Sequence, residues 1–559
     1  MKKKVALLLI LITTIAGLIW HFNGQHTQEV VAGAPAESRQ IILLPLDSRP
    51  PCSKLVADNG RTAGITVTTP PSQYMDFYTT PGDVIALRGW LAAEIKNNHP
   101  GEAIISIDQL LYGGLIASRN RNITENEIRA LIDYLRQLHH DNPDTKLYAF
   151  AILPRMTPPD YIEAYQDRKQ LMEWSRAFHL YTVEPTGDNY DYLYKVEKEL
   201  NPAHLRAYQE VYERNLRLNC MLAWLMQEGV LHQLVLAQDD GEDYSLPNYK
   251  LTEFMNYVNE HGIDTQRLAI IHGADEVALS ILANITTNMA YGNDKVGKSK
   301  FKVYIAYNST EAVEEIMPYM AINSLETAQE RLAFAHSRIV SSVDEADYIL
   351  FISCGSKENM NSRRSSIQWL RKYADQGKHI ALVDISQNFS AMEALLPLML
   401  KENYPVNSLT AYAGWNTASN AIGTAIAQTE IYLSALETSH NIDTAVYYNL
   451  HNLNNRFIED YYYLKDVIDV VNISLKKKGY TNVYDLDLNH NYVWSADMLR
   501  RALDQRVYQY KYSPSFRSPF LLPENGITYS VTDLSFDAFF PWPRTFEINL
   551  DTALKVEKQ

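Results

Sequence analysis

The sequence predicts an α/β protein built on mainly parallel sheets. Ten short apolar runs, rich in β-branched residues, alternate along the chain with longer amphipathic segments. Strands that are separated by helices imply parallel pairing through right-handed crossovers. Most of the runs are apolar on both faces, as is typical of strands covered by helices on both sides. The runs occupy residues 41–47, 65–69, 102–108, 146–153, 233–239, 267–273, 302–307, 348–353, 379–385 and 409–414.

Between and after these runs the pattern is helical. Residues 127–140 and 251–262 are amphipathic helices, and residues 154–232 form a long helical insertion that we expect to pack over the first sheet. The pattern is helical again from about residue 426 to 480. The tail from residue 506 is rich in Pro, Phe and Tyr, which suggests a segment laid back over the domains.

With 559 residues the chain is too long for one ordinary core, so several domains are expected. The polar segment 284–301 contains two glycines and is typical of a linker. We therefore predict an N-terminal α/β domain at 40–295, barrel-like or doubly wound, and a smaller doubly wound domain at 296–430. A helical C-terminal region and tail follow at 431–559. The alternative is one continuous barrel that uses eight of the ten strands.

The first residues are typical of an export signal. Lys2, Lys3 and Lys4 precede an uncharged apolar run from residue 5 to 20. The length of this run lies between that of a signal peptide and that of a full membrane span. We favour an uncleaved transmembrane anchor over a cleaved signal, with residues 1–39 as anchor and tether. In both cases the body is translocated, so we expect an extracytoplasmic protein, at the cell surface or secreted.

Composition narrows the classes of partner. A net charge of −15 and the lack of a long basic run exclude nucleic acid as an expected partner. The 37 tyrosines against 16 phenylalanines suit sugar-like ligands, because tyrosine combines an apolar face with a hydroxyl. The sequence contains no HExxH motif, no zinc-type Cys/His spacing and no EF-hand loop, so zinc is disfavoured. We assign no metal ligand and no cofactor, but the clustered carboxylates leave binding of a hard cation open. The sequence does not determine the oligomeric state.

Polar residues follow the apolar runs repeatedly. In an α/β protein the carboxyl ends of parallel strands face one rim, where ligands bind. A rim that combines carboxylates, arginines and amides suits a hydroxyl-rich ligand. The predicted substrate-binding residues are Asp47, Arg49, Asp108, Tyr112, Arg119, Arg155, His272, Asp275, Glu276, Trp415, Asn416 and Asn420.

The pair Asp239 and Asp240, at the end of LVLAQDD, is the predicted catalytic centre. Two neighbouring carboxylates cannot both ionise freely, so one pKa rises, as a general acid near neutral pH requires. Adjacent aspartates at a strand end are also similar to those of substrate-assisted N-acetylhexosaminidases. In those enzymes one aspartate orients the acetamide and the next protonates the glycosidic oxygen. The structural alternative is a turn capped by an aspartate before Gly241.

Five separated motifs resemble one bacterial family, catalogued as domain of unknown function 4127. They are LPLDSRPP, SIDQLLYGGLIASR, LAQDDGEDY, HGADEVALSILA and AYAGWNTASNAIGTAIAQ, and the resemblance runs from about residue 40 to 547. The chain departs from the family pattern after HIALVD, where it has the residues Ile385 to Phe389. The motif positions carry over onto Asp47, Arg49, Asp108, Tyr112, Gly113, Gly114, Arg119, Asp239, Asp240, Asp275, Glu276, Trp415, Asn416, Thr417 and Asn420.

The favoured interpretation is an exported, membrane-anchored hydrolase that acts on a carbohydrate or another hydroxyl-rich ligand. Its substrate would be a small molecule or a polysaccharide, with Asp239 as polariser and Asp240 as general acid. Two alternatives remain. One is a surface protein that binds solutes or cell wall without catalysis, and the other is a divalent-metal hydrolase that uses the same acids.

Overall fold

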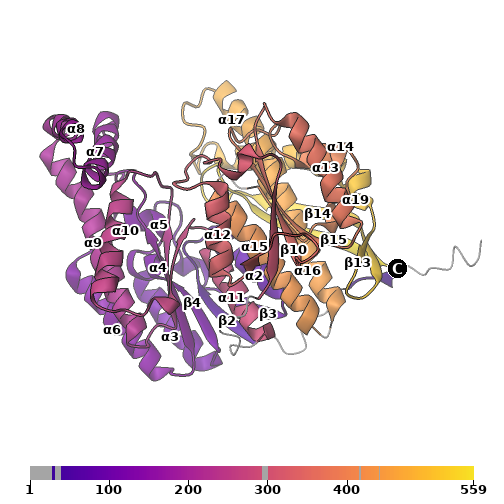
Figure 1. Ribbon diagram of the computed structural model, residues 1–559, viewed down its shortest axis with the longest axis horizontal. Helices are drawn as coiled ribbons and strands as arrows, with labels where there is room; N and C mark the ends of the chain where they lie inside the picture. The colour runs from indigo at the N-terminus through magenta and orange to yellow at the C-terminus, as the bar shows by residue number, and fades with distance from the viewer. Residues whose placement is uncertain (1–27, 32–38, 292–299, 415–416, 440) are drawn as a thin grey trace, which may run out of the picture.

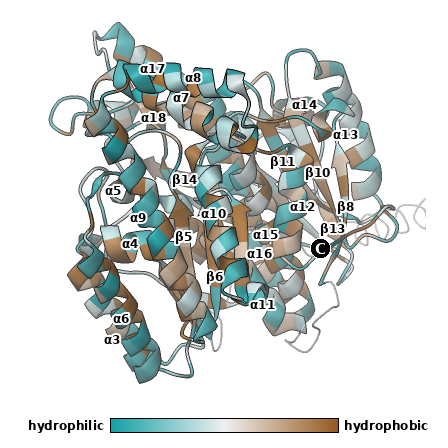
Figure 2. Ribbon diagram, turned by 60° about the vertical axis from the view of Figure 1, so that its left-hand side comes forward, coloured by the Kyte–Doolittle hydropathy of each residue, from teal (hydrophilic) through white to brown (hydrophobic). Residues whose placement is uncertain are grey.

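The computed structural model describes residues 28–31, 39–291, 300–414, 417–439 and 441–559. All ten predicted strands form, and all ten pair in parallel within two separate sheets (Figure 1). The predicted α/β class is therefore confirmed. The strands of both sheets are strongly hydrophobic, as Figure 2 shows for β5, β6 and β10, because helices cover them.

The first sheet has the strand order β3-β2-β4-β5-β6-β7. The direction of growth reverses between β2 and β4, and this switch point is where open α/β sheets bind ligands. The edge strands β3 and β7 do not pair with each other, so the sheet is open and the barrel alternative is wrong. The strands are β2 (Arg39–Leu44), β3 (Ile65–Thr68), β4 (Glu102–Ser106), β5 (Lys146–Leu153), β6 (Gln233–Gln238) and β7 (Leu268–His272).

The second sheet has the order β12-β11-β10-β8-β9, which is the arrangement of a doubly wound unit. Its central pair, β10 and β11, is in register over eight residues and fully buried apart from the first residue of β11. The predicted doubly wound second unit is therefore confirmed. The strands are β8 (Lys302–Tyr307), β9 (Arg338–Ile339), β10 (Tyr348–Gly355), β11 (His379–Ser386) and β12 (Ala411–Ala413).

The helices of the N-terminal half follow from apolar periodicity and polar caps. In α6 a capping box of Thr124 and Glu127 starts the helix, and its buried residues recur every three or four positions. The helices are α2 (Lys54–Thr62), α3 (Val84–Asn98), α4 (Ile107–Tyr112), α5 (Leu115–Asn120), α6 (Glu125–Asp141), α7 (Tyr165–Val183), α8 (Gly187–Glu199), α9 (Pro202–Gln227), α10 (Leu246–Glu260) and α11 (Val277–Tyr291). Short 3-10 turns occupy Pro50–Cys52, Ser72–Tyr74 and Thr265–Arg267.

The helical insertion only partly covers the first sheet. Helix α9 packs against α6 and α10 and contacts β6, whereas α7 and α8 project from the body as a hairpin (Figure 1). The hairpin shares a small hydrophobic cluster with α9 and α10, in which Trp174 of α7 and Tyr208 of α9 are buried. The expectation that the whole insertion lies over the sheet is therefore wrong for α7 and α8.

One hydrophobic core joins the two parallel sheets. Helix α11 packs against α15 (Ala418–Thr438), and both belong to a cluster that contains residues of both sheets. The expected linker at 284–301 begins inside α11, which continues to Tyr291, and residues 292–299 lie outside the described part. The division at residue 295 stays a prediction.

The C-terminal region is helical, as predicted, but its tail forms a sheet that the sequence did not reveal. Strands β13 (Phe520–Leu522), β14 (Ile527–Phe539) and β15 (Asn549–Lys558) pair antiparallel, and β1 (Gln28–Glu29) joins the edge. The remaining helices are α12 (Ser324–Phe334), α13 (Met360–Ala374), α14 (Leu396–Lys401), α16 (Ile442–Arg456), the π-helical segment Phe457–Val467, α17 (Ile468–Lys477), α18 (Tyr492–Lys511) and α19 (Pro514–Arg517), with 3-10 turns at Glu311–Val313 and Val406–Ser408.

Among the described residues, none of the helices combines the length and the apolar character needed to cross a membrane. The predicted anchor at residues 5–20 lies outside the described part of the chain. Export and anchoring stay predictions.

A substitution at Gly355, the last residue of β10, tests how tightly the second sheet packs. A Cβ atom there would overlap the main-chain carbonyl of Glu393, so we expect Gly355→Ala to lower the free energy of unfolding by about 1–3 kcal/mol. Gly89 lies inside α3 with open space at its Cβ position. Gly89→Ala should instead stabilise by about 0.5–1 kcal/mol. Urea denaturation measures the free energy of unfolding of both variants. Equal changes in the two variants would contradict the prediction.

Candidate functional site

A cavity of about 320 Å³ lies at the carboxyl ends of the first sheet's strands. We call it the rim cavity. It brings together seven of the predicted site residues: Arg49, Arg119, Arg155, Asp239, Asp240, Asp275 and Asn420. The rest of its wall comes from Leu115, Ile116, Ala274, Tyr319, Thr417, Trp542, Arg544 and Phe546. Segments from both parallel sheets and from the C-terminal tail therefore meet there.

The acid pair directly follows β6, and its two carboxyls have different surroundings. Asp239 forms an ion pair with Arg119. Burial acts to raise its pKa, but Arg119 and Arg155 outweigh burial and hold the pKa below the ordinary value. Asp240 lies 3.6 Å from Arg155, and its side chain is 34% exposed. Burial, followed by the charge of Asp239, raises the pKa of Asp240 to about 7. Near neutral pH the pair thus combines an ionised carboxyl, Asp239, with a partly protonated one, Asp240.

Arg49 joins two strand ends across the cavity floor. Its guanidinium donates to Asp47 at 2.7 Å and to Asp275 at 2.7 and 3.3 Å. It also lies 5.3 Å from the ring centroid of Trp542. Asp275 reaches the cavity, as the sequence predicted for one of the two acids at 275 and 276. Burial raises its pKa, although Arg49 opposes the shift.

Four predicted ligand-binding residues lie beneath the cavity surface instead of lining it. Asp47 is fully buried against Arg49. Asp108 accepts a hydrogen bond from the Ile152 main-chain nitrogen at 2.8 Å, and burial raises its pKa to about 6. Tyr112 is buried in the first sheet's core. Because these groups are enclosed, they hold strands and loops in place and do not touch a ligand in this conformation.

Glu276 is the fourth of these residues. It forms a buried ion pair with Arg331 of α12. The sequence could not show this partner, which comes from the second half of the chain.

Gly273, just before these acids, has a φ of +105° that favours glycine, and a Cβ there would approach Asn420 to 3.0 Å.

His272 and Asn420 lie beside the acid pair. His272 lines a small crevice together with Asp239 and Asp240, and its Nδ1 lies 2.8 Å from the Glu330 carboxylate. The Asn420 side-chain oxygen accepts from the Ala274 nitrogen at 3.2 Å. The two other predicted residues of this segment, Trp415 and Asn416, lie outside the described residues.

Sequence reasoning missed the aromatic wall of the cavity. Trp542 and Phe546 flank Arg544, whose guanidinium lies 4.8 and 5.4 Å from their ring centroids. The prolines of PWPRTF, which fix the backbone around the tryptophan, were the available signal. Asp485, from the C-terminal region, accepts a hydrogen bond from Tyr78 at 2.5 Å beside this wall.

Tyr319 is another unforeseen wall residue, and its backbone is strained. Its φ is +67°, which is rare for an aromatic residue, and it stacks on Phe389, whose φ is +53°. The Tyr319 carbonyl accepts from the nitrogen of Gly241, directly after the acid pair, at 3.2 Å. The Tyr319 side chain remains exposed. Strain of this kind gathers at functional sites.

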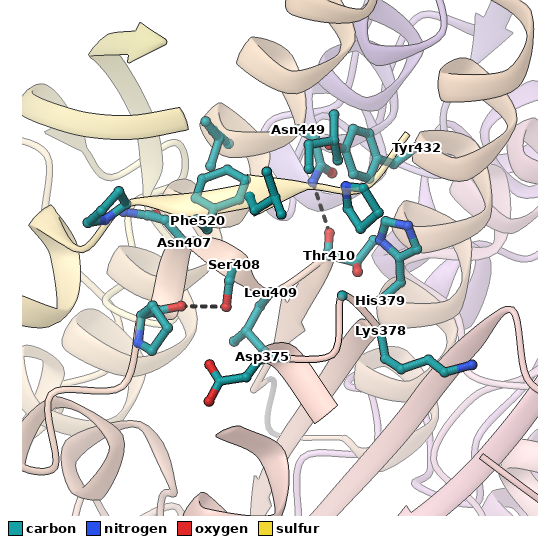
Figure 3. Close-up of a pocket in the computed structure, with 18 residues that line it drawn as sticks. Asp375, Lys378, His379, Asn407, Ser408, Leu409, Thr410, Tyr432, Asn449 and Phe520 are labelled. Atoms are coloured by element: carbon teal, nitrogen blue, oxygen red, sulfur yellow. Dashed lines mark hydrogen bonds between the residues drawn. The ribbon is translucent and has the colours of Figure 1, made fainter. Parts of the chain in front are cut away.

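Another cavity lies at the amino ends of β11 and β12, away from the acid pair (Figure 3). Its polar side chains are already engaged. Asn449 donates to the Thr410 carbonyl at 3.0 Å, Asn407 donates to the Phe516 carbonyl at 2.7 Å, and His379 lies 2.7 Å from Glu524. None of the predicted site residues that the structure describes lines it, so it is a poorer candidate than the rim cavity.

No cluster of three His, Cys, Asp or Glu side chains suited to a metal ion occurs within the described residues.

The family model described as "Protein of unknown function (DUF4127)" matches residues 41–551. No curated protein matches the sequence.

The ion pairs that join Arg49 to Asp47 and Asp275 can be tested by measuring the free energy of unfolding. Arg49→Met leaves the buried Asp47 carboxylate without its partner, so we expect a loss of about 3–5 kcal/mol. The matched control is Arg501→Met, whose ion pair with Asp497 is exposed and should contribute less than about 1 kcal/mol. Chemical denaturation measures both. A loss no larger than that of the control would show that Arg49 does not support the cavity floor.

Proposed function

Because the chain belongs to the DUF4127 family, whose description names no reaction, we propose a function from the rim cavity itself: hydrolysis of a carbohydrate, with Asp240 as general acid. The observation that carries the proposal is the difference between the two adjacent carboxyls. Asp239 is held ionised by Arg119, while Asp240 keeps a proton up to about pH 7. Paired carboxyls with separated pKa values are typical of acid and base assignments in hydrolases.

In the proposed reaction Asp240 donates its proton to the glycosidic oxygen while the bond from that oxygen to the anomeric carbon breaks. The fixed negative charge of Asp239 polarises the reacting centre and stabilises the positive charge that develops there. A water molecule then adds to the anomeric carbon, and the proton that it releases returns to Asp240. The site is thereby regenerated with no other reactant consumed.

The remaining wall suits a sugar. Each cavity arginine has a carboxylate partner, so donors and acceptors alternate around the space: Arg49 with Asp275, Arg119 with Asp239, Arg155 with Asp240, and Arg544 with Glu547. Such alternation matches hydroxyl groups, which both donate and accept. The rings of Tyr319 and Phe546 provide flat apolar faces for the carbon side of a pyranose.

The same ion pairs also support a second candidate, a protein that binds carbohydrate without catalysis. All three cavity aspartates have an arginine partner, and ligand hydroxyls could simply bridge these pairs. A product after long incubation with a bound oligosaccharide distinguishes the two candidates. Stoichiometric binding with no product would favour the binding protein.

The first test of catalysis is Asp240→Asn. This variant keeps the shape of the side chain but cannot donate the proton, so turnover should fall by about 10²–10⁴-fold. In the wild type, kcat/KM should fall as pH rises through about 7, because Asp240 then loses its proton. A panel of oligosaccharides and cell-wall fractions, assayed for new reducing ends, supplies the measurement. An unchanged rate in a folded Asp240→Asn variant would exclude the proposed acid.

The second test concerns the aromatic face of Tyr319. Tyr319→Ala removes the ring, so we expect KM to rise about three- to tenfold while kcat changes little. Tyr319→Phe keeps the ring and should stay close to the wild type. A drop in kcat in both variants would show that the hydroxyl, and not the ring, is what the site uses.

A further inference from the structure

A second cavity, of about 350 Å³, adjoins the rim cavity and shares Arg119 with it. We call it the side cavity. It lies between the chain after α5 and the helix α9. Its lining consists of Arg119, Asn120, Arg121, Asn122, Tyr161, Ala207, Glu210, Val211 and Arg214. None of these residues except Arg119 belongs to the proposed catalytic site.

The side cavity holds a buried positive charge. Arg214 is only 4% exposed and donates to the carbonyl oxygens of Arg121 and Ser118 at 2.9 and 3.0 Å. Its guanidinium also lies 5.2 Å from the ring centroid of Tyr112. Within the described residues no carboxylate forms an ion pair with Arg214. Burial of an unpaired charge is costly, so an anion beside Arg214 would be favoured.

The nearby acids are engaged elsewhere. Glu210, one helical turn before Arg214, pairs with Arg217 at 2.8 Å. Asp160 accepts from Asn120 at 3.0 Å and lies 3.5 Å from Arg168. They therefore compensate the positive charge of this cavity only weakly.

Arg121 adds a second cation to the side cavity. It donates to the Tyr112 carbonyl at 2.7 Å and forms no ion pair in the described part of the chain, although its charge helps to lower the pKa of Glu127 of α6. The contrast with the rim cavity is clear, because each arginine there has a carboxylate partner. The exposed ring of Tyr161 completes the wall and offers a flat face.

We propose that the side cavity is a second subsite, which binds an anionic sugar unit next to the unit held in the rim cavity. The shared chemistry is an oxyanion, either a carboxylate or a sulfate group, bound beside Arg121 and Arg214. Arg119 lies between the two subsites. The substrate class is thus an acidic oligosaccharide of at least two units. This inference rests on the proposed carbohydrate function of the rim cavity.

Ala207 provides a matched pair of variants, because its side chain lines the cavity from α9 and takes part in none of the contacts above. Ala207→Glu adds a negative charge that competes with an anion, and Ala207→Gln adds the same bulk without charge. At constant ionic strength, replacing chloride with inorganic sulfate should raise the unfolding midpoint of the wild type and Ala207→Gln more than that of Ala207→Glu. Equal rises in the two variants would overturn the anion site, whatever the catalytic activity.

The link between the subsites is tested with sugars of defined length. Calorimetry of galacturonic acid, its dimer and trimer, a sulfated disaccharide and neutral cello-oligosaccharides should show affinity that rises from one acidic unit to two. In Ala207→Glu the affinity for the acidic dimer should fall about tenfold relative to Ala207→Gln, because like charges repel. Equal affinity for neutral and acidic dimers, or no loss in Ala207→Glu, would overturn the proposal. Binding of no sugar at all would contradict the proposed function as well, while the sulfate result would still decide the anion site.

Discussion

The ion pairs of Arg49 are the interaction on which the rim cavity depends. Strands β2 and β7 are separated by three strands in the first sheet, so they lie about 19 Å apart at the usual spacing. Arg49 nevertheless bonds Asp47, which follows β2, and Asp275, which follows β7. The loops must therefore bend inward over the sheet. Trp542 lies against the same guanidinium and brings the C-terminal tail to the cavity.

Once the loops converge, the balance of burial and neighbouring charges sets the pKa of each member of the acid pair. Burial acts on Asp239 and Asp240 alike and favours their neutral forms. Arg119 contacts Asp239 directly and reverses the effect there, whereas Arg155 lies farther from Asp240 and does not. Two chemically identical neighbours therefore have different charges near neutral pH. The separation arises from position and not from residue type.

The two adjoining cavities differ in how their positive charges are balanced. In the rim cavity each arginine has a carboxyl side chain as its partner. In the side cavity Arg214 bonds only to carbonyl oxygens and an aromatic face, so its charge is solvated but not cancelled. Helix α9, which supplies Arg214, belongs to the insertion after β5. The insertion thus supplies the buried cation of the proposed second subsite.

The sequence by itself determined the ten parallel strands, because two-sided apolar runs are a local property that any core of this class must bury. It also placed Asp239 and Asp240 at a strand end, and hence at the rim. Only the tertiary structure decided which acids reach the cavity. Asp108 and Asp240 both follow apolar runs, yet Asp108 accepts a hydrogen bond from the main chain of β5 and does not reach the cavity. Glu276 instead forms an ion pair with Arg331 of α12. Trp542, from the C-terminal tail, likewise reaches the cavity wall only through tertiary packing. Partners so distant along the chain are chosen by packing, which leaves no local pattern to read.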